Sequence, residues 1–147
     1  MGKARFLIYL RMPFIVGIGG AHSRAGKTTC ACSLLRRLKG WGAVKCTPVN
    51  GRPSIIAGKR LLNQKDKDTA RLLEAGAETV LWVKAPRNEM EKTLKAALGR
   101  LSHLKGVIIE GNSGILAVKP DIVIFVRGKG EIKRGADAVL SIADIIV

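Results

Sequence analysis

The sequence predicts an α/β fold in which helices cover both faces of a mainly parallel sheet. Short, continuous apolar runs, typical of strands buried on both faces of such a sheet, alternate along the chain with segments of helical periodicity. This alternation predicts parallel strands joined by right-handed helical crossovers. With 147 residues, 47% of them hydrophobic and 25% charged, the chain has the size and composition of one globular domain. We therefore expect a single domain over residues 1–147, with residues 1–11 as either a tail or an extra edge segment.

The predicted strands are short apolar runs bounded by glycine, proline or polar residues. In chain order they cover residues 14–20, 42–47, 79–85, 106–111 and 121–126. The predicted helices show apolar residues at helical spacing. They cover residues 26 or 27 to about 39, 68–75, about 88 to 103, and 136–142. The Pro-, Gly- and Asn-rich stretch 48–58 is predicted to be a loop, and the chain closes on the apolar segment "DIIV".

The first predicted strand leads directly into "AHSRAGKTT", which matches the phosphate-binding loop (P-loop) pattern G-x-x-x-x-G-K-[ST] with alanine at the first position. Backbone N–H groups of such a loop surround a β-phosphate, and the N-terminus of the next helix adds partial positive charge. In this pattern Lys27 bridges the β- and γ-phosphates and the Thr28 hydroxyl binds Mg²⁺. The candidate nucleotide-binding residues of the loop are Ala21, His22, Ser23, Arg24, Ala25, Gly26, Lys27, Thr28 and Thr29.

The position of this motif, between a buried strand and an amphipathic helix, is the one that the chemistry requires. It favours the three-layer fold of the P-loop NTPases over the alternative, a glycine-rich turn followed by an ordinary helix with a lysine at its start. We therefore interpret the chain as a Mg²⁺-dependent P-loop nucleotide-binding protein.

A P-loop protein also needs a carboxylate near the metal ion. Glu110 meets this need because it is the only acidic residue that ends a fully apolar strand, where an uncompensated charge is costly. We interpret Lys27 and Glu110 as the candidate catalytic residues. The alternative for Glu110 is a structural carboxylate capped by the amides of Gly111 and Asn112.

The first two aspartates of the chain are informative because residues 1–65 contain no acidic residue. Asp66 and Asp68 lie at the start of a predicted helix, and we interpret them as outer or inner ligands of Mg²⁺. With Thr28 and Glu110 they complete the predicted metal site. The alternative for Asp68 is a helix N-cap, a role that aspartate often has.

The formal charge of +15 is unevenly distributed along the chain. Residues 1–65 carry 13 Lys and Arg, whereas residues 66–147 carry 13 basic and 11 acidic residues. Such a charge attracts polyanions, among them nucleotides, phosphorylated small molecules, an acidic partner protein or nucleic acid. Nucleic acid is disfavoured because interleaved aromatic residues are missing from the basic part. The alternative is a solvated surface that keeps the protein in solution.

Cellular location is predicted from cysteines and hydropathy. Cys30, Cys32 and Cys46 form an odd set without disulfide-like spacing, which indicates a reducing compartment. No run approaches the roughly 18 apolar residues of a membrane-spanning helix. Arg11 interrupts the apolar stretch near the N-terminus, and no small-residue cleavage site follows it. We therefore interpret the protein as cytoplasmic, with no membrane association.

Five segments give the chain a resemblance to the molybdopterin-guanine dinucleotide biosynthesis protein B (MobB) family of P-loop proteins. They are "GGAHSRAGKTT", "VKCT", "KDTARLLEAGAETVLWV", "VIIEGNS" and "ADIIV", and the resemblance extends from residue 14 to the C-terminus. The layout is also similar to that of dethiobiotin synthetase and its relatives. This similarity implies that Lys45 binds a substrate or phosphate anion, that Asp68 or Asp66 helps to hold Mg²⁺, and that Glu110 is a metal carboxylate.

The MobB resemblance implies an accessory protein that binds GTP, hydrolyses it slowly and acts in the biosynthesis of molybdopterin guanine dinucleotide, a form of the molybdenum cofactor. It implies GTP (or ATP) and Mg²⁺ as cofactors, and molybdopterin or a molybdopterin nucleotidyltransferase as partner, and it leaves a homodimer open. The alternative from the dethiobiotin synthetase layout is an ATP-dependent kinase or ligase that acts on a small acid. The alternative from the binding class is a nucleic-acid-binding module.

Overall fold

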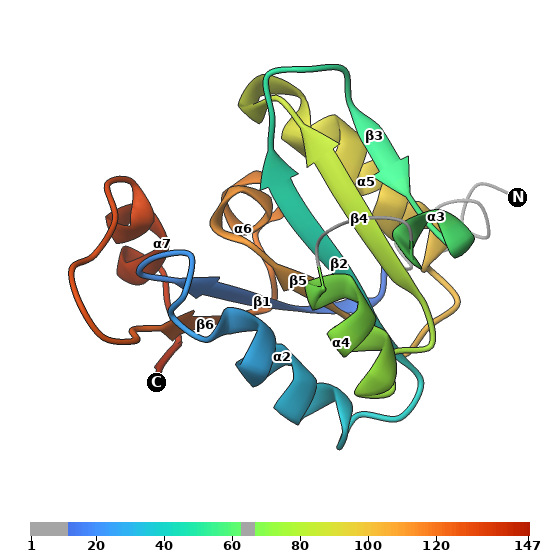
Figure 1. The fold of residues 1–147 in the computed structure, drawn as a ribbon, viewed down its shortest axis with the longest axis horizontal. Coiled ribbons are helices and arrows are strands. Elements are labelled where there is room, and N and C mark those ends of the chain that lie inside the picture. The colour runs from blue at the N-terminus through green and yellow to red at the C-terminus, as the bar shows by residue number, and fades with distance from the viewer. Residues whose placement is uncertain (1–11, 63–66) are drawn as a thin grey trace, which may run out of the picture.

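Figure 1 shows the computed structural model of the protein, which describes residues 12–62 and 67–147. In these residues seven strands form one sheet, in the order β3-β4-β2-β5-β1-β6-β7. Neighbouring strands are parallel, except that β3 runs antiparallel to β4 at one edge. The strands are β1 (Phe14–Gly20), β2 (Trp41–Pro48), β3 (Ser54–Ile56), β4 (Val80–Ala85), β5 (Gly106–Glu110), β6 (Ile122–Val126) and β7 (Ile145–Ile146).

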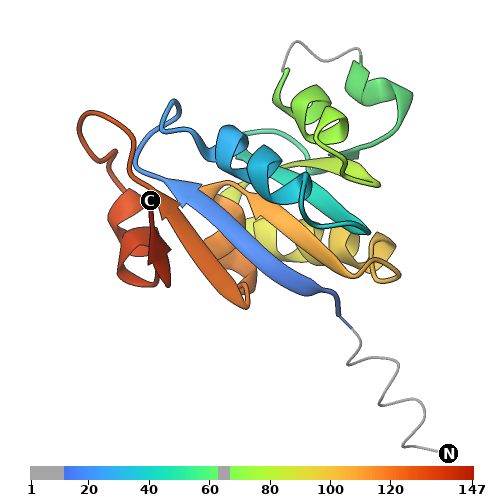
Figure 2. The ribbon, with the colours of Figure 1, turned by 90° about the horizontal axis from the view of Figure 1, so that it is seen from below.

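Helices lie on both faces of this sheet, as Figure 2 shows. α2, α3 and α4 pack on one face, and α5, α6 and α7 pack on the other. The helices are α2 (Lys27–Leu35), α3 (Lys59–Leu62), α4 (Asp68–Glu74), α5 (Met90–Arg100), α6 (Asn112–Val118) and α7 (Ala136–Ser141), with a 3₁₀ turn, η1 (Arg87–Glu89), before α5. The prediction of an α/β fold with a mainly parallel sheet and helices on both faces is therefore confirmed.

Each face of the sheet has its own hydrophobic core because side chains alternate along a strand. Ile18 and Ile108 point to the face that α2 and α4 cover. Val44 and Ile109 point to the opposite face, where Leu94 of α5 packs against them. All five side chains are fully buried. Strands with apolar residues on both faces are the reason that the sequence shows continuous apolar runs rather than alternation.

The strand order brings three distant chain segments together at the carboxyl end of the sheet. β5 lies between β1 and β2, and its last residue, Glu110, is the register partner of Ile18 on β1 and of Lys45 on β2. The loop that follows β1 leads into α2 at this same edge. Ligands of open parallel sheets bind outside the carboxyl ends of the strands. This edge is therefore the place to examine for a functional site.

Three short elements were not predicted. The stretch 48–58 is not entirely loop, because Ser54–Ile56 forms β3 and pairs with β4. The helix α3 has only four residues, too few for a periodic pattern to stand out, and α6 lies in a segment for which no helix is predicted. α6 also contains Gly114, which lets it approach β2 closely. A Cβ at Gly114 would lie 2.6 Å from Cys46 Sγ.

Two predicted helices are shorter than expected. α2 ends at Leu35 rather than near residue 39, because its last turn tightens and the Arg37 N–H donates to the Leu34 carbonyl only three residues earlier (3.0 Å). α5 has 11 residues because the 3₁₀ turn η1 replaces its predicted first turn. Among the described residues, no helix combines the length and the apolar character needed to traverse a membrane.

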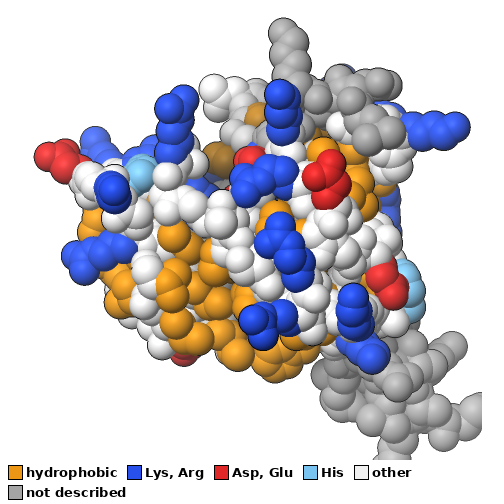
Figure 3. All heavy atoms as spheres, turned by 60° about the horizontal axis from the view of Figure 1, so that its bottom comes forward, with side chains coloured by type: hydrophobic (Ala, Val, Ile, Leu, Met, Phe, Trp, Pro, Cys, Tyr) orange, Lys and Arg blue, Asp and Glu red, His pale blue; other side chains and the backbone are white. Residues whose placement is uncertain are grey.

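The strongly basic part of the chain, residues 1–65, does not form a separate half of the molecule. β1, α2, β2 and β3 belong to the basic residues 1–65, but β5 lies between β1 and β2, and β4 lies between β2 and β3. Lys and Arg side chains are accordingly spread over the face in Figure 3 rather than gathered in one patch. On this face the basic side chains are thus dispersed.

The packing of α5 gives a prediction about stability. We expect Leu94→Ala to lower the free energy of unfolding by about 2–5 kcal/mol, because the truncation leaves a cavity at a fully buried position. Lys92→Ala, on the exposed side of the same helix, is the matched control and should change stability by less than about 0.5 kcal/mol. Urea unfolding of the three proteins measures both values, and equal effects of the two substitutions would contradict the packing described here.

Candidate functional site

The loop between β1 and α2, residues 21–26, is the segment that the sequence predicts to bind phosphate. Ala21 is fully buried, and its N–H donates to the Val126 carbonyl (3.0 Å) while its carbonyl accepts from the Lys133 N–H (2.6 Å). Its φ is not positive, so alanine is tolerated at the first position of the pattern without backbone strain. The loop ends at Gly26, whose φ of 107° favours glycine.

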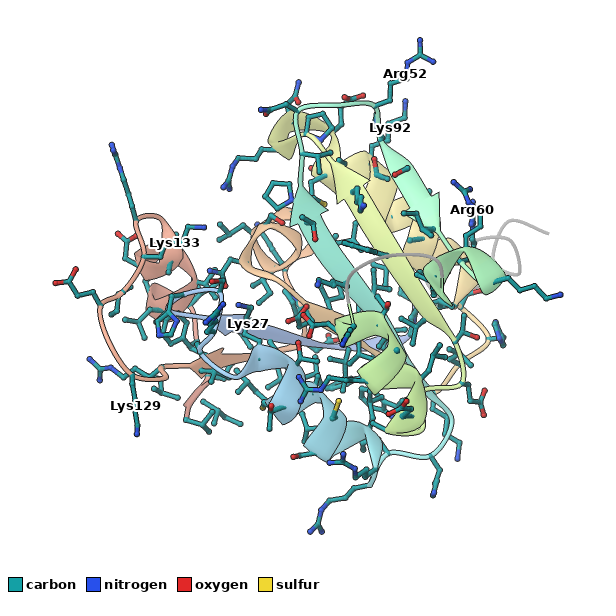
Figure 4. The ribbon with its side chains drawn as sticks, in the orientation of Figure 1. Lys27, Arg52, Arg60, Lys92, Lys129 and Lys133 are labelled. Atoms are coloured by element: carbon teal, nitrogen blue, oxygen red, sulfur yellow. The ribbon has the colours of Figure 1, made fainter. Side chains whose placement is uncertain are left out.

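Lys27, the first residue of α2, reaches back over this loop at the carboxyl end of β1 (Figure 4). Its Nζ donates to the His22 carbonyl (3.1 Å), which also accepts the Ala25 N–H (3.2 Å). Gly20 makes this path possible, because a Cβ there would lie 2.9 Å from Lys27 Cγ. The ammonium group is therefore held against the loop, where an anion bound by the loop would meet it.

The remaining loop residues contribute in different ways. Ser23 and Arg24 are exposed, and the Arg24 N–H donates to His22 Nδ1 (3.3 Å). Ala25 is buried and packs with the core of the α2 face. Thr29 is exposed on the first turn of α2. Ser23, Arg24 and Thr29 are thus exposed but line the cavity beside the loop, while Ala25 contributes its backbone and its packing.

Thr28 and Glu110, 82 residues apart in the chain, meet inside the protein. Both are buried, with 6% and 4% of their surface exposed, and Thr28 Oγ1 donates to Glu110 Oε1 (3.1 Å). Burial raises the pKa of the Glu110 carboxyl above its ordinary value. The charges of Lys45 and Lys27, followed by the hydrogen bond from Thr28, act in the opposite direction. The carboxylate is therefore poorly solvated but surrounded by groups that favour its ionised form.

The structure limits the alternative in which amides cap Glu110. The Gly111 N–H donates instead to the Ile18 carbonyl (3.0 Å) and is not available to the carboxylate. Gly111 has a φ of 130°, and a Cβ there would lie 2.6 Å from the Cys46 carbonyl oxygen. Only glycine fits this position without strain, so the backbone turns away directly after Glu110.

A chain of polar contacts links β2, α4 and α2. Lys45 Nζ lies 3.1 Å from Asp68 Oδ2, and Arg71 Nη1 lies 3.8 Å from Asp68 Oδ1. Arg71 Nη2 also donates to Thr29 Oγ1 (2.9 Å). Asp68 is not the N-cap of α4, because Lys67 has that position and Asp68 is the first helical residue. The N-cap alternative is wrong because the carboxylate of Asp68 turns toward two cations.

These groups surround a cavity of about 260 Å³ beside the loop, here called the metal-side cavity. Its lining includes Gly26, Lys27, Thr28, Asp68, Arg71 and Glu110. Lys45 does not line it but holds Asp68 at its wall. Asp66, the other predicted metal ligand, lies outside the described residues.

The oxygen groups of the metal-side cavity determine how a divalent cation could be bound. Among the residues that the structure describes, no group of three His, Cys, Asp or Glu side chains is arranged to hold a metal ion. Thr28 and Glu110 could therefore supply two oxygen ligands and Asp68 a third contact, with water and phosphate completing the shell. Mg²⁺ bound next to phosphate normally has few protein ligands of this kind.

Sequence reasoning missed two residues of this region. Arg71 lines the metal-side cavity, and its only sequence signal is a spacing of three residues from Asp68 on a predicted helix. Asn112 joins the start of α6 to β1, because its Oδ1 accepts the Gly20 N–H and its Nδ2 donates to the Gly20 carbonyl (both 3.0 Å). No local pattern reveals a contact between residues 92 positions apart.

No protein-family model matches this chain, and no curated protein matches it. The site is therefore interpreted from its own chemistry. A loop that ends at a helix N-terminus, with a lysine across it, suits a phosphate group. A buried carboxylate paired with a hydroxyl next to that lysine suits a hard divalent cation.

The raised pKa of Glu110 predicts a dependence of stability on pH. The folded state binds a proton on Glu110 more tightly than the unfolded state does. The contribution of this residue to the free energy of unfolding should therefore fall as pH rises from the ordinary carboxyl pKa through the raised pKa. We expect Glu110→Gln to remove this component in metal-free buffer, from the ordinary carboxyl pKa of about 4 upward.

Urea unfolding across this pH range, with chelator present, measures the difference between wild type and variant. Glu74→Gln, which removes an exposed carboxylate, is the control. A Glu110→Gln protein with the pH dependence of the wild type would contradict the described burial of the ionised group.

Proposed function

We propose that the loop 21–26 and the first turn of α2 bind the phosphates of a nucleoside triphosphate together with Mg²⁺, as the P-loop of a three-layer P-loop NTPase does. The observation that carries this proposal is the buried hydrogen bond from Thr28 Oγ1 to Glu110 Oε1 (3.1 Å). Both are oxygen ligands of the type that Mg²⁺ prefers, and they come from the two segments that the motif requires. In a purely structural role, the charge of this buried carboxylate would be compensated by Lys45, Lys27 and the hydrogen bond from Thr28.

The residues would divide the work as follows. Lys27 contacts phosphate oxygens and stabilises the charge that develops during transfer of the terminal phosphoryl group. Thr28 and Glu110 hold the metal ion, which neutralises phosphate charge and draws a further contact from Asp68. Lys45 holds Asp68 in place and is the second cation that an anionic substrate would meet. Loop amides from residues 22–28 supply the remaining hydrogen bonds to phosphate.

We further propose that the nucleotide is GTP and that hydrolysis is slow. This step rests on the resemblance to the MobB family, whose implied role is that of an accessory protein in the biosynthesis of molybdopterin guanine dinucleotide. Molybdopterin, or the nucleotidyltransferase that attaches the nucleotide to it, would then be the partner.

The competing proposal is an ATP-dependent kinase or ligase that acts on a small acid. The position of Lys45 favours it, since this side chain is only 13% exposed and lies opposite Glu110 on the neighbouring strand, where it could meet a carboxylate substrate. The two proposals share the loop, the metal ion and the roles of Lys27 and Glu110, but differ in the nucleotide.

Nucleotide titrations separate the two proposals. We expect GTP to bind at least tenfold more tightly than ATP in the presence of Mg²⁺, because the MobB role uses guanine nucleotide. Isothermal titration calorimetry with non-hydrolysable analogues of both nucleotides measures the ratio. Tighter binding of the ATP analogue would remove the support for the molybdopterin role and favour the kinase or ligase.

Substitution of Lys27 and Glu110 tests the shared mechanism. Lys27→Ala should lower nucleotide affinity and turnover together, each by at least about tenfold, because the ammonium contacts phosphate in both the ground and the transition state. Glu110→Gln should keep most of the nucleotide affinity but lose Mg²⁺-dependent turnover, because it retains the hydrogen-bonding shape and removes the charge. Phosphate release and nucleotide binding are measured for each variant.

Lys129→Ala is the control for removal of one positive charge near the loop. Lys129 is exposed, lies outside residues 21–26 and does not line the metal-side cavity. It should leave both quantities within about twofold of the wild type. Wild-type turnover and Mg²⁺ dependence in Glu110→Gln would refute the metal role of Glu110 and reduce it to a structural residue.

A further inference from the structure

A second cavity lies on the other side of Lys27. Its volume is about 200 Å³, and it opens at the carboxyl end of the sheet next to the loop 21–26. Its polar lining comes from four separate parts of the chain, namely the loop with α2, the turn after β4, the N-terminus of α6 and the segment between β6 and α7. The polar side chains used below are His22, Lys27, Arg87, Ser113, Lys133 and Arg134.

The charge of this second cavity is of one sign. Lys27, Arg87, Lys133 and Arg134 line it, and no Asp or Glu does so among the described residues. The metal-side cavity differs, because Asp68 and Glu110 line it. Four cations without a compensating carboxylate produce a positive potential that concentrates anions. The second cavity is therefore suited to an anion, whereas the metal-side cavity is suited to a cation and a phosphate together.

Two polar atoms at the second cavity lack partners. His22 Nε2 and Ser113 Oγ are buried and have no hydrogen-bond partner among the described residues. Buried polar atoms are nearly always hydrogen-bonded in folded proteins, so such atoms call for an explanation. Both residues line the cavity. A ligand with several acceptor oxygens would satisfy both.

Hydrogen bonds to the backbone join the segments that form the walls of the second cavity. Asn112, which lines it beside Ser113, makes two hydrogen bonds to Gly20 (both 3.0 Å) and so joins α6 to the end of β1. The Lys133 N–H donates to the Ala21 carbonyl (2.6 Å), which ties the segment before α7 to the loop. These contacts hold the backbone around the cavity in place, whereas the side chains of Arg87, Lys133 and Arg134 are exposed.

We propose that the second cavity binds the phosphomonoester group of a small phosphorylated compound, next to the terminal phosphate of the nucleotide. The position beside the nucleotide rests on the proposed function, whereas the preference for a phosphomonoester rests on the cavity itself. A phosphomonoester carries nearly two negative charges at neutral pH and presents three acceptor oxygens. The two guanidinium groups of Arg87 and Arg134 suit such a group because they form paired hydrogen bonds with phosphate.

The size of the cavity sets a limit on what enters it. A volume of about 200 Å³ is smaller than the roughly 300–1,000 Å³ of pockets that enclose a whole drug-sized ligand. The cavity thus accommodates the phosphorylated end of a compound, and the rest of the molecule extends toward solvent.

Glycerol 3-phosphate is the probe for this site, with malonate as a dicarboxylate of equal charge and glycerol as an uncharged control. Calorimetric titration at low salt is carried out on the full chain, alone and with Mg²⁺ and a non-hydrolysable GTP analogue. We expect glycerol 3-phosphate to bind in both conditions and at least about tenfold more tightly than malonate, because the phosphate gathers its charge and its three acceptor oxygens on one atom, whereas malonate divides its charge between two carboxylates.

Two substitutions with matched controls test the residues. Arg87→Ala and Lys133→Ala should each weaken binding of glycerol 3-phosphate by about tenfold, the loss expected for one charge-assisted hydrogen bond. The controls Arg52→Ala and Lys129→Ala remove the same charges at exposed positions that do not line the cavity, and should change the affinity by less than about twofold. Figure 4 shows Lys133 and Lys129 on the same segment and Arg52 projecting away from the body of the protein.

Three outcomes would overturn the proposal. Equal losses in the control variants would show that binding follows net charge alone, and equal binding of malonate would overturn the preference for phosphate. Loss of glycerol 3-phosphate binding when the GTP analogue is present would show that the second cavity belongs to the nucleotide site.

Failure of the proposed function would look different. If the GTP analogue did not bind the wild type but glycerol 3-phosphate bound with the expected dependence on Arg87 and Lys133, the nucleotide site would be refuted and the anion site supported. Binding of the GTP analogue without binding of glycerol 3-phosphate would refute the second cavity alone.

Discussion

The buried carboxylate of Glu110 sets the main electrostatic constraint on this fold. β5 carries it into the interior at the end of an apolar strand, where an ionised group is costly unless other groups compensate its charge. Compensation comes from both neighbouring strands, since Lys45 lies opposite on β2 and Lys27 follows the loop after β1. Thr28 adds a hydrogen bond of 3.1 Å. The strand order, with β5 between β1 and β2, is what brings these groups to one carboxylate.

The compensation of Glu110 also explains why α4 lies where it does. Lys45 is held between two partners, the carboxylate of Asp68 at 3.1 Å and the ring of Trp82, whose centroid lies 5.1 Å from Nζ. Asp68 opens α4, and Arg71 on the next turn bonds to Thr29 of α2. The two helices on this face are thus linked by polar contacts at their N-terminal ends, above the apolar core that they share.

The sequence predicts the parts of this structure that depend on local pattern. β1 and β5 are visible as continuous apolar runs because burial on both faces leaves no polar residues in them. The pairing of Thr28 with Glu110 could be anticipated because the P-loop pattern fixes one partner and the end of a buried strand fixes the other. β3, with three residues, and α3, with four, are too short to show a period, so their formation depends on tertiary contacts.

The residues that were missed, or given the wrong role, depend on contacts between distant segments. Asp68 has the sequence position of an N-cap, but Lys45, 23 residues earlier, and Arg71 determine where its carboxylate points. The sequence around Asn112 suggests a loop residue, whereas in the fold its side chain bonds to Gly20. From the sequence, Arg87 and Lys133 are expected to be ordinary solvated surface residues. Only the fold shows that both line the same cavity. Local propensity cannot encode such pairings, because the partner is chosen by strand order.

Lys27 is the one charged residue that lines both cavities among the described residues, and this position couples them. Two anions, one on each side of a single ammonium group, would compete for its charge, so binding at one side would weaken binding at the other. If Glu110 and Thr28 hold a divalent cation, as proposed, the ion would change this balance, because it would neutralise the phosphate on its own side and leave Lys27 to the anion on the other. The metal ion would then be needed for both anions to bind together. Glu110, which would hold the ion, would thus affect anion binding in the second cavity without contacting that cavity.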